Sequence, residues 1–130
     1  MTTVLACLSI AALLPYVLAF VGVYYKNRQF GTVDNHNPRV QAAQLKGAGA
    51  RAVAAQANAW EALALFTASL VAAYLAGVAP ASLATPALVF AAARIAHGAS
   101  YVGDLAPVRS GSFAVGFAMC IWIFVKALAA

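Results

Sequence analysis

The chain has 130 residues, of which 65% are hydrophobic and only 8% are charged, and its mean hydropathy is +0.86. Soluble domains average about half apolar and about a quarter charged residues, so this composition argues against a water-soluble globular fold. A membrane-spanning helix needs about 20 apolar residues, which limits a chain of this length to four spans. The 34 alanines and 9 glycines suit the close helix contacts of membrane proteins.

The first apolar stretch, residues 4–25, carries no charge and is long enough to span. A cleaved signal peptide would have positive charge before its apolar run, whereas here Lys26 and Arg28 follow it. We therefore expect a retained helix with Pro15 as a kink. Positive charge after the span places the N-terminus outside the cytoplasm.

Residues 26–42 are the most polar part of the chain and are expected to form a loop. Asn37 followed by Pro38 is a helix-start signal, which predicts a second helix over 38–76. Two short connections then separate a third helix, 81–102, from a fourth, 108–128. The sequence thus predicts an all-α integral membrane four-helix bundle in a single domain.

Charge distribution predicts the topology of this bundle. Five of the eight basic residues lie between the first two spans, Arg109 lies between the last two, and the middle connection has none. The positive-inside rule then places both termini outside and the first and third connections in the cytoplasm. Because the net charge of +5 comes mostly from these flanking residues, no nucleic-acid partner is expected.

The two cysteines, Cys7 and Cys120, both lie in apolar runs and lack the spacing of a metal or redox motif. We interpret them as small core residues. No metal site is expected. A haem ligand role for His97 would need a second histidine inside the membrane, and His36 lies in a loop.

Polar residues inside a span are candidates for function because lipid tolerates few of them. Helical spacing places Arg51, Asn58 and Glu61 on one side of the second helix. It also places Arg94, His97 and Tyr101 along one stripe of the third.

The depth of these residues predicts that the two sets meet. With Arg51 and Asp104 as markers of the cytoplasmic boundary, Glu61 and Arg94 both lie roughly 15 Å below it at 1.5 Å per residue. We therefore expect an ion pair between Glu61 and Arg94. The pair could serve only to fix helix register, but the polar side chains stacked above it favour the floor of a cavity open to the cytoplasm.

Arg109 and Ser110 fall in the first turn of the last helix. An arginine beside free helix N–H groups forms an anion site and can hold a thiolate at neutral pH. A juxtamembrane arginine that merely follows the charge rule is an equally good interpretation of Arg109.

Two segments resemble the MAPEG superfamily, the membrane-associated proteins in eicosanoid and glutathione metabolism. The first, RAVAAQANAWEALALF at 51–66, is similar to the family's signature on its second helix. The second, RIAHGASYVGDLAPVRS at 94–110, is similar to the prostaglandin E synthase and microsomal glutathione transferase branch. The stretch DNHNPR at 34–39 resembles that of small bacterial members, and the resemblance extends over essentially the whole chain.

The resemblance implies a homotrimer that binds glutathione between neighbouring subunits on the cytoplasmic side. It implies that Arg109 stabilises the glutathione thiolate and that Ser110 assists. Lys26, less directly, falls where the family has basic contacts at the end of the first helix. The residues implied to bind the tripeptide are Arg28, Asn58, Glu61, Arg94, His97 and Tyr101. The implied function is a glutathione-dependent transferase or peroxidase acting on lipophilic electrophiles or lipid hydroperoxides in the bilayer.

Two departures from the family pattern bear on cofactor affinity. Ala54 stands where family enzymes often have an arginine, and Phe113 stands where some have a tyrosine. Ala54 supports an alternative function, a non-catalytic trimeric scaffold or lipid-binding protein of the same fold. A second alternative, a small proton-coupled multidrug exporter, needs a freely titrating membrane glutamate, whereas Glu61 is expected to have Arg94 at its own depth.

Overall fold

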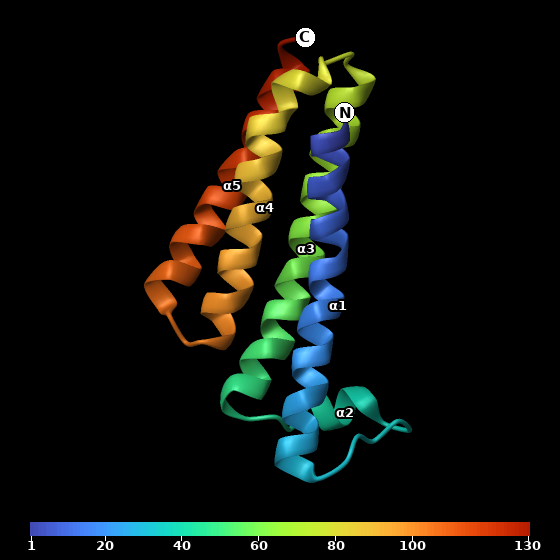
Figure 1. Cartoon of the computed structure of the whole chain (residues 1–130), viewed down its shortest axis with the longest axis vertical. Coiled ribbons are helices and arrows are strands. Elements are labelled where there is room, and N and C mark those ends of the chain that lie inside the picture. Colours follow the sequence, from blue (N-terminus) through green and yellow to red (C-terminus); the bar gives the residue numbers. More distant parts are fainter.

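The computed structural model describes all 130 residues, and its regular elements are all helices. Along the chain they are α1 (Thr2–Phe30), α2 (Pro38–Ala43), α3 (Gly47–Leu75), α4 (Pro80–Val102) and α5 (Ala106–Leu128). The four long helices run along the long axis, with both termini at one end and α2 and the α4–α5 turn toward the other, here called the connector end (Figure 1). The all-helical fold class is confirmed.

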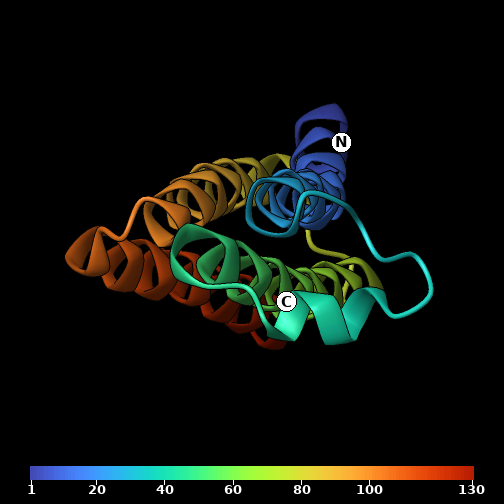
Figure 2. The ribbon, with the colours of Figure 1, turned by 90° about the horizontal axis from the view of Figure 1, so that it is seen from below.

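Seen from below, along the bundle, α1 and α4 lie on one side and α3 and α5 on the other (Figure 2). Helix α1 packs on α3, and α4 packs on α5. The pairs join because α1 also contacts α4 and α3 contacts both α4 and α5. Helices α1 and α5 make no contact with each other.

The segment 38–76 is not one helix, because residues 44–46 separate α2 from α3. Gln29 of α1 satisfies two backbone groups that this break frees. Its Nε2 donates to the Gln44 carbonyl at 3.0 Å, and its Oε1 accepts from the Lys46 N–H at 3.0 Å. Gly47 then takes a φ of 56°, which glycine adopts readily. The single helix expected over 38–76 is thus divided, and the short α2 gives five helices where four were expected.

Helix α1 continues past the expected end at Tyr25 to Phe30. It ends at Gly31, whose φ is 75° and whose N–H donates to the Asn27 carbonyl at 3.0 Å. This is a left-handed glycine cap, the commonest way to satisfy the last carbonyls of a helix. The charged residues at the end of α1 therefore remain helical and extend beyond the apolar stretch.

Helices α1, α3 and α5 are long and apolar enough to cross a membrane. Helix α4 matches α5 in length but carries Arg94 and His97, which lower its hydropathy. Both of these side chains are buried within the bundle, where a spanning helix can accommodate them. A fourth span at α4 stays a prediction.

The largest apolar core lies toward the terminal end of the bundle. Phe66 of α3 stacks on Phe90 of α4 with ring centroids 4.0 Å apart, and both are fully buried. Cys7 and Cys120 are free thiols buried in the same cluster, which confirms their interpretation as core residues. A smaller cluster of Leu18, Ala55 and Ala59 lies toward the connector end. The buried polar residues of α4 begin where the larger core ends.

The connector between α1 and α2 is held by side-chain bonds to its own backbone. Asp34 Oδ1 accepts from the N–H groups of His36 at 2.8 Å and Asn37 at 3.0 Å. Asn37 occupies the cap position before Pro38, as expected, but its side chain makes no capping bond. Gln41 completes the loop, since its Oε1 accepts from the Asp34 N–H and its Nε2 donates to the Thr32 carbonyl.

Acidification is expected to loosen this connector. The Asn37 N–H, followed by that of His36, holds the pKa of the Asp34 carboxyl below its usual range. Because the pKa is lower in the folded state, the carboxylate stabilises the loop fully above the ordinary value of about 4, and that stabilisation disappears as the pH falls through the lower folded pKa. Hydrogen exchange at His36 and Asn37, corrected for intrinsic rates, should show protection lost at low pH. Asp34→Asn keeps an acceptor oxygen without the charge, so equal pH dependence in that variant contradicts the prediction.

Candidate functional site

Arg94 is the most deeply buried charge in the protein, with 3% of its surface exposed. Its Nη2 donates to Asn58 Oδ1 at 2.7 Å and to the Asn58 backbone carbonyl at 3.3 Å. Asn58 Nδ2 in turn donates to Glu61 Oε2 at 3.2 Å. Three residues predicted from the sequence are therefore linked in one chain of hydrogen bonds between α3 and α4.

The expected ion pair between Glu61 and Arg94 is absent. The one salt bridge in the protein joins Arg51 to Asp104. Asn58 lies one turn from Glu61 on α3 and takes the position beside the guanidinium. Glu61 is exposed on the surface of the single chain, and its carboxylate forms no salt bridge within it. The depth estimate brought the correct helices together but assigned the wrong partner to Arg94.

A cavity of about 190 Å³, here called the central cavity, opens beside this chain of bonds. Asn58, Glu61 and Arg94 form its polar part, and the Nε of Arg94 is buried without a hydrogen-bond partner. The remaining wall is mostly apolar and comes from α3, α4 and α5, with Leu65, Phe90, Phe113, Phe117 and Cys120 among its residues. The cavity can therefore place an anionic or polar group beside an apolar one.

Gly116 of α5 lets the Arg94 side chain pass close to the helix backbone. A Cβ built at Gly116 would lie 3.3 Å from Arg94 Cδ and 3.8 Å from Phe90 Cδ2. The 3.3 Å distance to Arg94 is tighter than ordinary van der Waals contact, so a larger residue at position 116 would push on the Arg94 side chain. Gly116 was not among the predicted site residues, and the only sign of it in the sequence is a glycine inside an expected helix.

A second group of predicted residues surrounds the start of α5. The Arg109 guanidinium carbon lies 4.7 Å from the centre of the Tyr101 ring, a cation–π distance. Tyr101 also makes an edge contact with His97, whose ring lies 6.2 Å from that of Phe113. Because Phe113 lines the central cavity, this group is continuous with it. The Nδ1 of His97 is buried without a partner.

Ser110, Arg28 and Lys26 do not join these two groups. Ser110 is exposed, and its hydroxyl makes no hydrogen bond within the chain. Arg28 lies at the end of α1, where its Nη1 donates to the Tyr24 hydroxyl at 3.4 Å. Lys26 is buried, and its ammonium donates to the Pro38 carbonyl at 2.8 Å, so it braces the connector.

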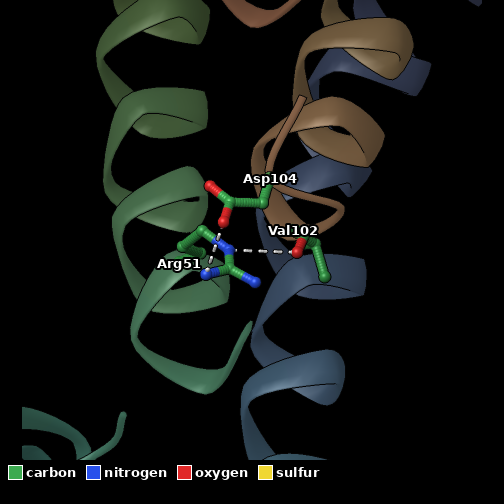
Figure 3. Close-up of polar contacts among 3 residues, drawn as sticks. All are labelled: Arg51, Val102 and Asp104. Atoms are coloured by element: carbon green, nitrogen blue, oxygen red, sulfur yellow. Dashed lines mark hydrogen bonds and ion pairs between the residues drawn. The ribbon is translucent and has the colours of Figure 1, made fainter. Parts of the chain in front are cut away.

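Arg51 ties the turn between α4 and α5 to α3 (Figure 3). Its Nη1 lies 3.3 Å from Asp104 Oδ2, and its Nε donates to the Val102 carbonyl at 3.2 Å. Asp104 is the only non-glycine residue with a positive φ, 62°. Because this turn lies between Tyr101 and Arg109, Arg51 fixes the segment that brings those two side chains together. Both residues were expected at the cytoplasmic boundary, but the salt bridge between them was not predicted.

The charges around the site suit an anion. Arg94 and Arg109 contribute two guanidinium groups, one of which has an unused donor, against the single exposed carboxylate of Glu61. No cluster of three or more His, Cys, Asp or Glu side chains could hold a metal ion. The residues present therefore fit a small molecule with carboxylate or thiolate groups.

Removing the amide that partners Arg94 should destabilise the protein. Asn58→Leu leaves a buried guanidinium without its shortest hydrogen bond, with an expected loss of about 2 kcal/mol in the free energy of unfolding. Glu61→Gln keeps an acceptor for Asn58 at an exposed position and should change it by less than about 0.5 kcal/mol. Denaturant titration in mixed micelles measures both. A larger loss of unfolding free energy for Glu61→Gln than for Asn58→Leu would contradict this prediction and favour a direct ion pair between Glu61 and Arg94.

The turn held by Arg51 gives a second prediction. Asp104→Ala removes the salt bridge and puts alanine, which tolerates a positive φ less well than aspartate, at this position. The expected loss in the free energy of unfolding is about 1–2 kcal/mol. Asp104→Gly loses the same carboxylate but removes the backbone strain, so its cost should be smaller. Thermal unfolding in detergent compares the two. Equal destabilisation would mean that the backbone conformation at residue 104 carries no cost.

Comparison with known proteins adds one finding to this geometry. A model of the MAPEG family matches residues 3–129, nearly the whole chain. No curated protein and no solved structure matches it. The apolar helices and the family match together make the protein an integral membrane protein. The chain belongs to the MAPEG family.

Proposed function

We propose that the protein is a glutathione-dependent membrane transferase or peroxidase that acts on lipophilic electrophiles or lipid hydroperoxides. The observation that carries this proposal is the central cavity, in which the buried Arg94 guanidinium and Asn58 face an apolar wall that includes Phe113 and Phe117. Such a cavity suits a charged tripeptide beside an apolar reactant. Family membership supports the same class of function.

The charges of the site complement those of glutathione. Its two carboxylates and its thiolate suit arginines, and Arg94 is the arginine that lines the central cavity. The exposed carboxylate of Glu61 suits an ammonium group, while Asn58 holds Glu61 in place. Bound glutathione would supply the nucleophilic sulfur.

Arg109 is the residue proposed to activate that sulfur. A guanidinium near a thiol favours the thiolate, and lowering a thiol pKa by about two units raises its ionised fraction at neutral pH many-fold. The Tyr101 ring under Arg109 restrains the guanidinium, and Ser110 is exposed on the same turn. Phe113 and Phe117 are also partly exposed, at 45% and 48%, so a lipophilic reactant can approach from the bilayer.

We further propose a homotrimer with the connector end in the cytoplasm and both termini outside. Helices α1 and α5 do not touch within one chain, and a trimer would let Arg28 of one subunit meet a glutathione held by Arg109 of its neighbour. The basic residues around the connector support the cytoplasmic placement.

A non-catalytic scaffold of the same fold is the second candidate. Ala54 favours it, because a methyl side chain at that position cannot bind a glutathione carboxylate. Family membership removes the basis for the exporter hypothesis.

Ultraviolet absorbance of the thiolate tests the proposal directly. Titration of purified protein with glutathione at neutral pH should produce a thiolate signal that Arg109→Ala abolishes. Lys126→Ala removes a cation from the other end of the same helix and should leave the signal unchanged. Absence of binding at millimolar glutathione would favour the scaffold, and a signal that survives Arg109→Ala would remove Arg109 from its proposed role.

A further inference from the structure

A second cavity lies at the connector end, on the other side of α3 from the central cavity. It has a volume of about 440 Å³ and is bounded by α1, α2 and α3. Ala19, Gly22 and Val23 of α1 and Val53 of α3 form its apolar wall. We call it the connector cleft, and it shares no lining residue with the central cavity.

Small side chains leave the connector cleft open. A Cβ built at Gly22 would meet only Val53 Cγ2, at 3.9 Å, which is ordinary contact. The glycine is therefore not required for close packing of α1 on α3, and its missing side chain adds to the space. Ala42 and Ala43 of α2 close the cleft on the connector side.

The polar residues of the cleft are cationic or neutral. The Arg39 side chain is exposed and makes no hydrogen bond or ion pair within the chain. The side chain of the half-buried Gln56 also lacks a hydrogen bond. The Lys26 ammonium uses one of its three N–H donors on Pro38. No acidic side chain lines the cleft. An occupant that complements this lining has a negative group beside Arg39 and Lys26.

The position of the cleft places it where lipid headgroups lie. Its α1 wall runs from Ala19 to Lys26, so it begins inside the uncharged stretch of α1 and ends at that helix's first charged residue. Basic residues in this position attract anionic lipids, and a guanidinium can bind phosphate through two parallel hydrogen bonds. The apolar wall below suits the upper part of an acyl chain.

We propose that the connector cleft binds an anionic phospholipid. The headgroup phosphate contacts Arg39 and the free donors of Lys26, and an acyl chain lies along Val23 and Val53. Such a lipid joins α1, α2 and α3 and stabilises the break that separates α2 from α3. This inference does not depend on glutathione chemistry.

Native mass spectrometry of the detergent-purified protein tests the proposal, with phosphatidylglycerol and phosphatidylcholine of identical chains as probes. The wild type should retain phosphatidylglycerol preferentially. Arg39→Gln should weaken that binding roughly five-fold, as expected for one cation near an anionic lipid, and Arg39→Lys should retain much of it. Lys126→Gln makes the same charge change near the other end of the bundle and should have no effect.

A cleft-filling variant checks the location independently. Gly22→Leu should reduce binding of phosphatidylglycerol while leaving the charge unchanged. Equal retention of the two lipids, or equal losses for Arg39→Gln and Lys126→Gln, would overturn the proposal. Full displacement of the lipid by inorganic phosphate would identify a free anion as the occupant and would also overturn it.

Two further results would assign the cleft to another occupant and refute the lipid. If Arg39→Gln changed the oligomeric state and left lipid retention intact, a second copy of the chain would fill the cleft. If it weakened glutathione binding and left lipid retention intact, the cleft would belong to the glutathione site. Failure of glutathione to bind at all would instead contradict the proposed function and leave the lipid result standing.

Discussion

The constraint on which the rest of the site depends is a guanidinium inside a helical bundle. A buried charge is costly unless its hydrogen-bond donors are satisfied, and Arg94 meets this requirement in part, because its Nη2 donates to the side chain and to the backbone carbonyl of Asn58 while its Nε has no partner. Both acceptors belong to one residue of α3, so the bonds fix α4 against α3 in rotation as well as in height. Gly116 completes the arrangement because α5 can approach the same side chain closely.

The Arg94 guanidinium separates the bundle into two regions with different properties. On the terminal side, Phe66 and Phe90 stack in a dry core that holds the helices together. On the connector side, His97 and Tyr101 continue the polar stripe of α4, and a short turn held by Arg51 leads to Arg109. The dry core and the candidate site therefore occupy successive levels of the same helices, and Arg94 lies at the boundary with a buried Nε that has no hydrogen-bond partner.

Much of this could be predicted from the sequence because membrane helices make polar residues conspicuous. The stripe on α4 and the level of Asn58 follow from helical spacing alone, and the chain's composition determines that the fold is helical. The break at residues 44–46 could not be predicted, because it depends on Gln29, a side chain from a helix distant in sequence. The partner of Arg94 was missed for a related reason: spacing gives depth and face, but it does not decide which of two acceptors on one face lies nearer.

The geometry of a single chain also limits what it can do alone. Arg94 and Arg109 lie on one side of the protein, on the α4–α5 pair, whereas Arg28 is at the end of α1, and α1 never touches α5. Arg28 lines neither the central cavity nor the contact between Tyr101 and Arg109. If all three arginines bind the same small anion, the proposed trimer would let a neighbouring subunit supply its Arg28, and assembly then becomes part of the site. The weak apolar contacts available between membrane helices would in that case be reinforced by the ligand itself, because it binds only where two subunits meet.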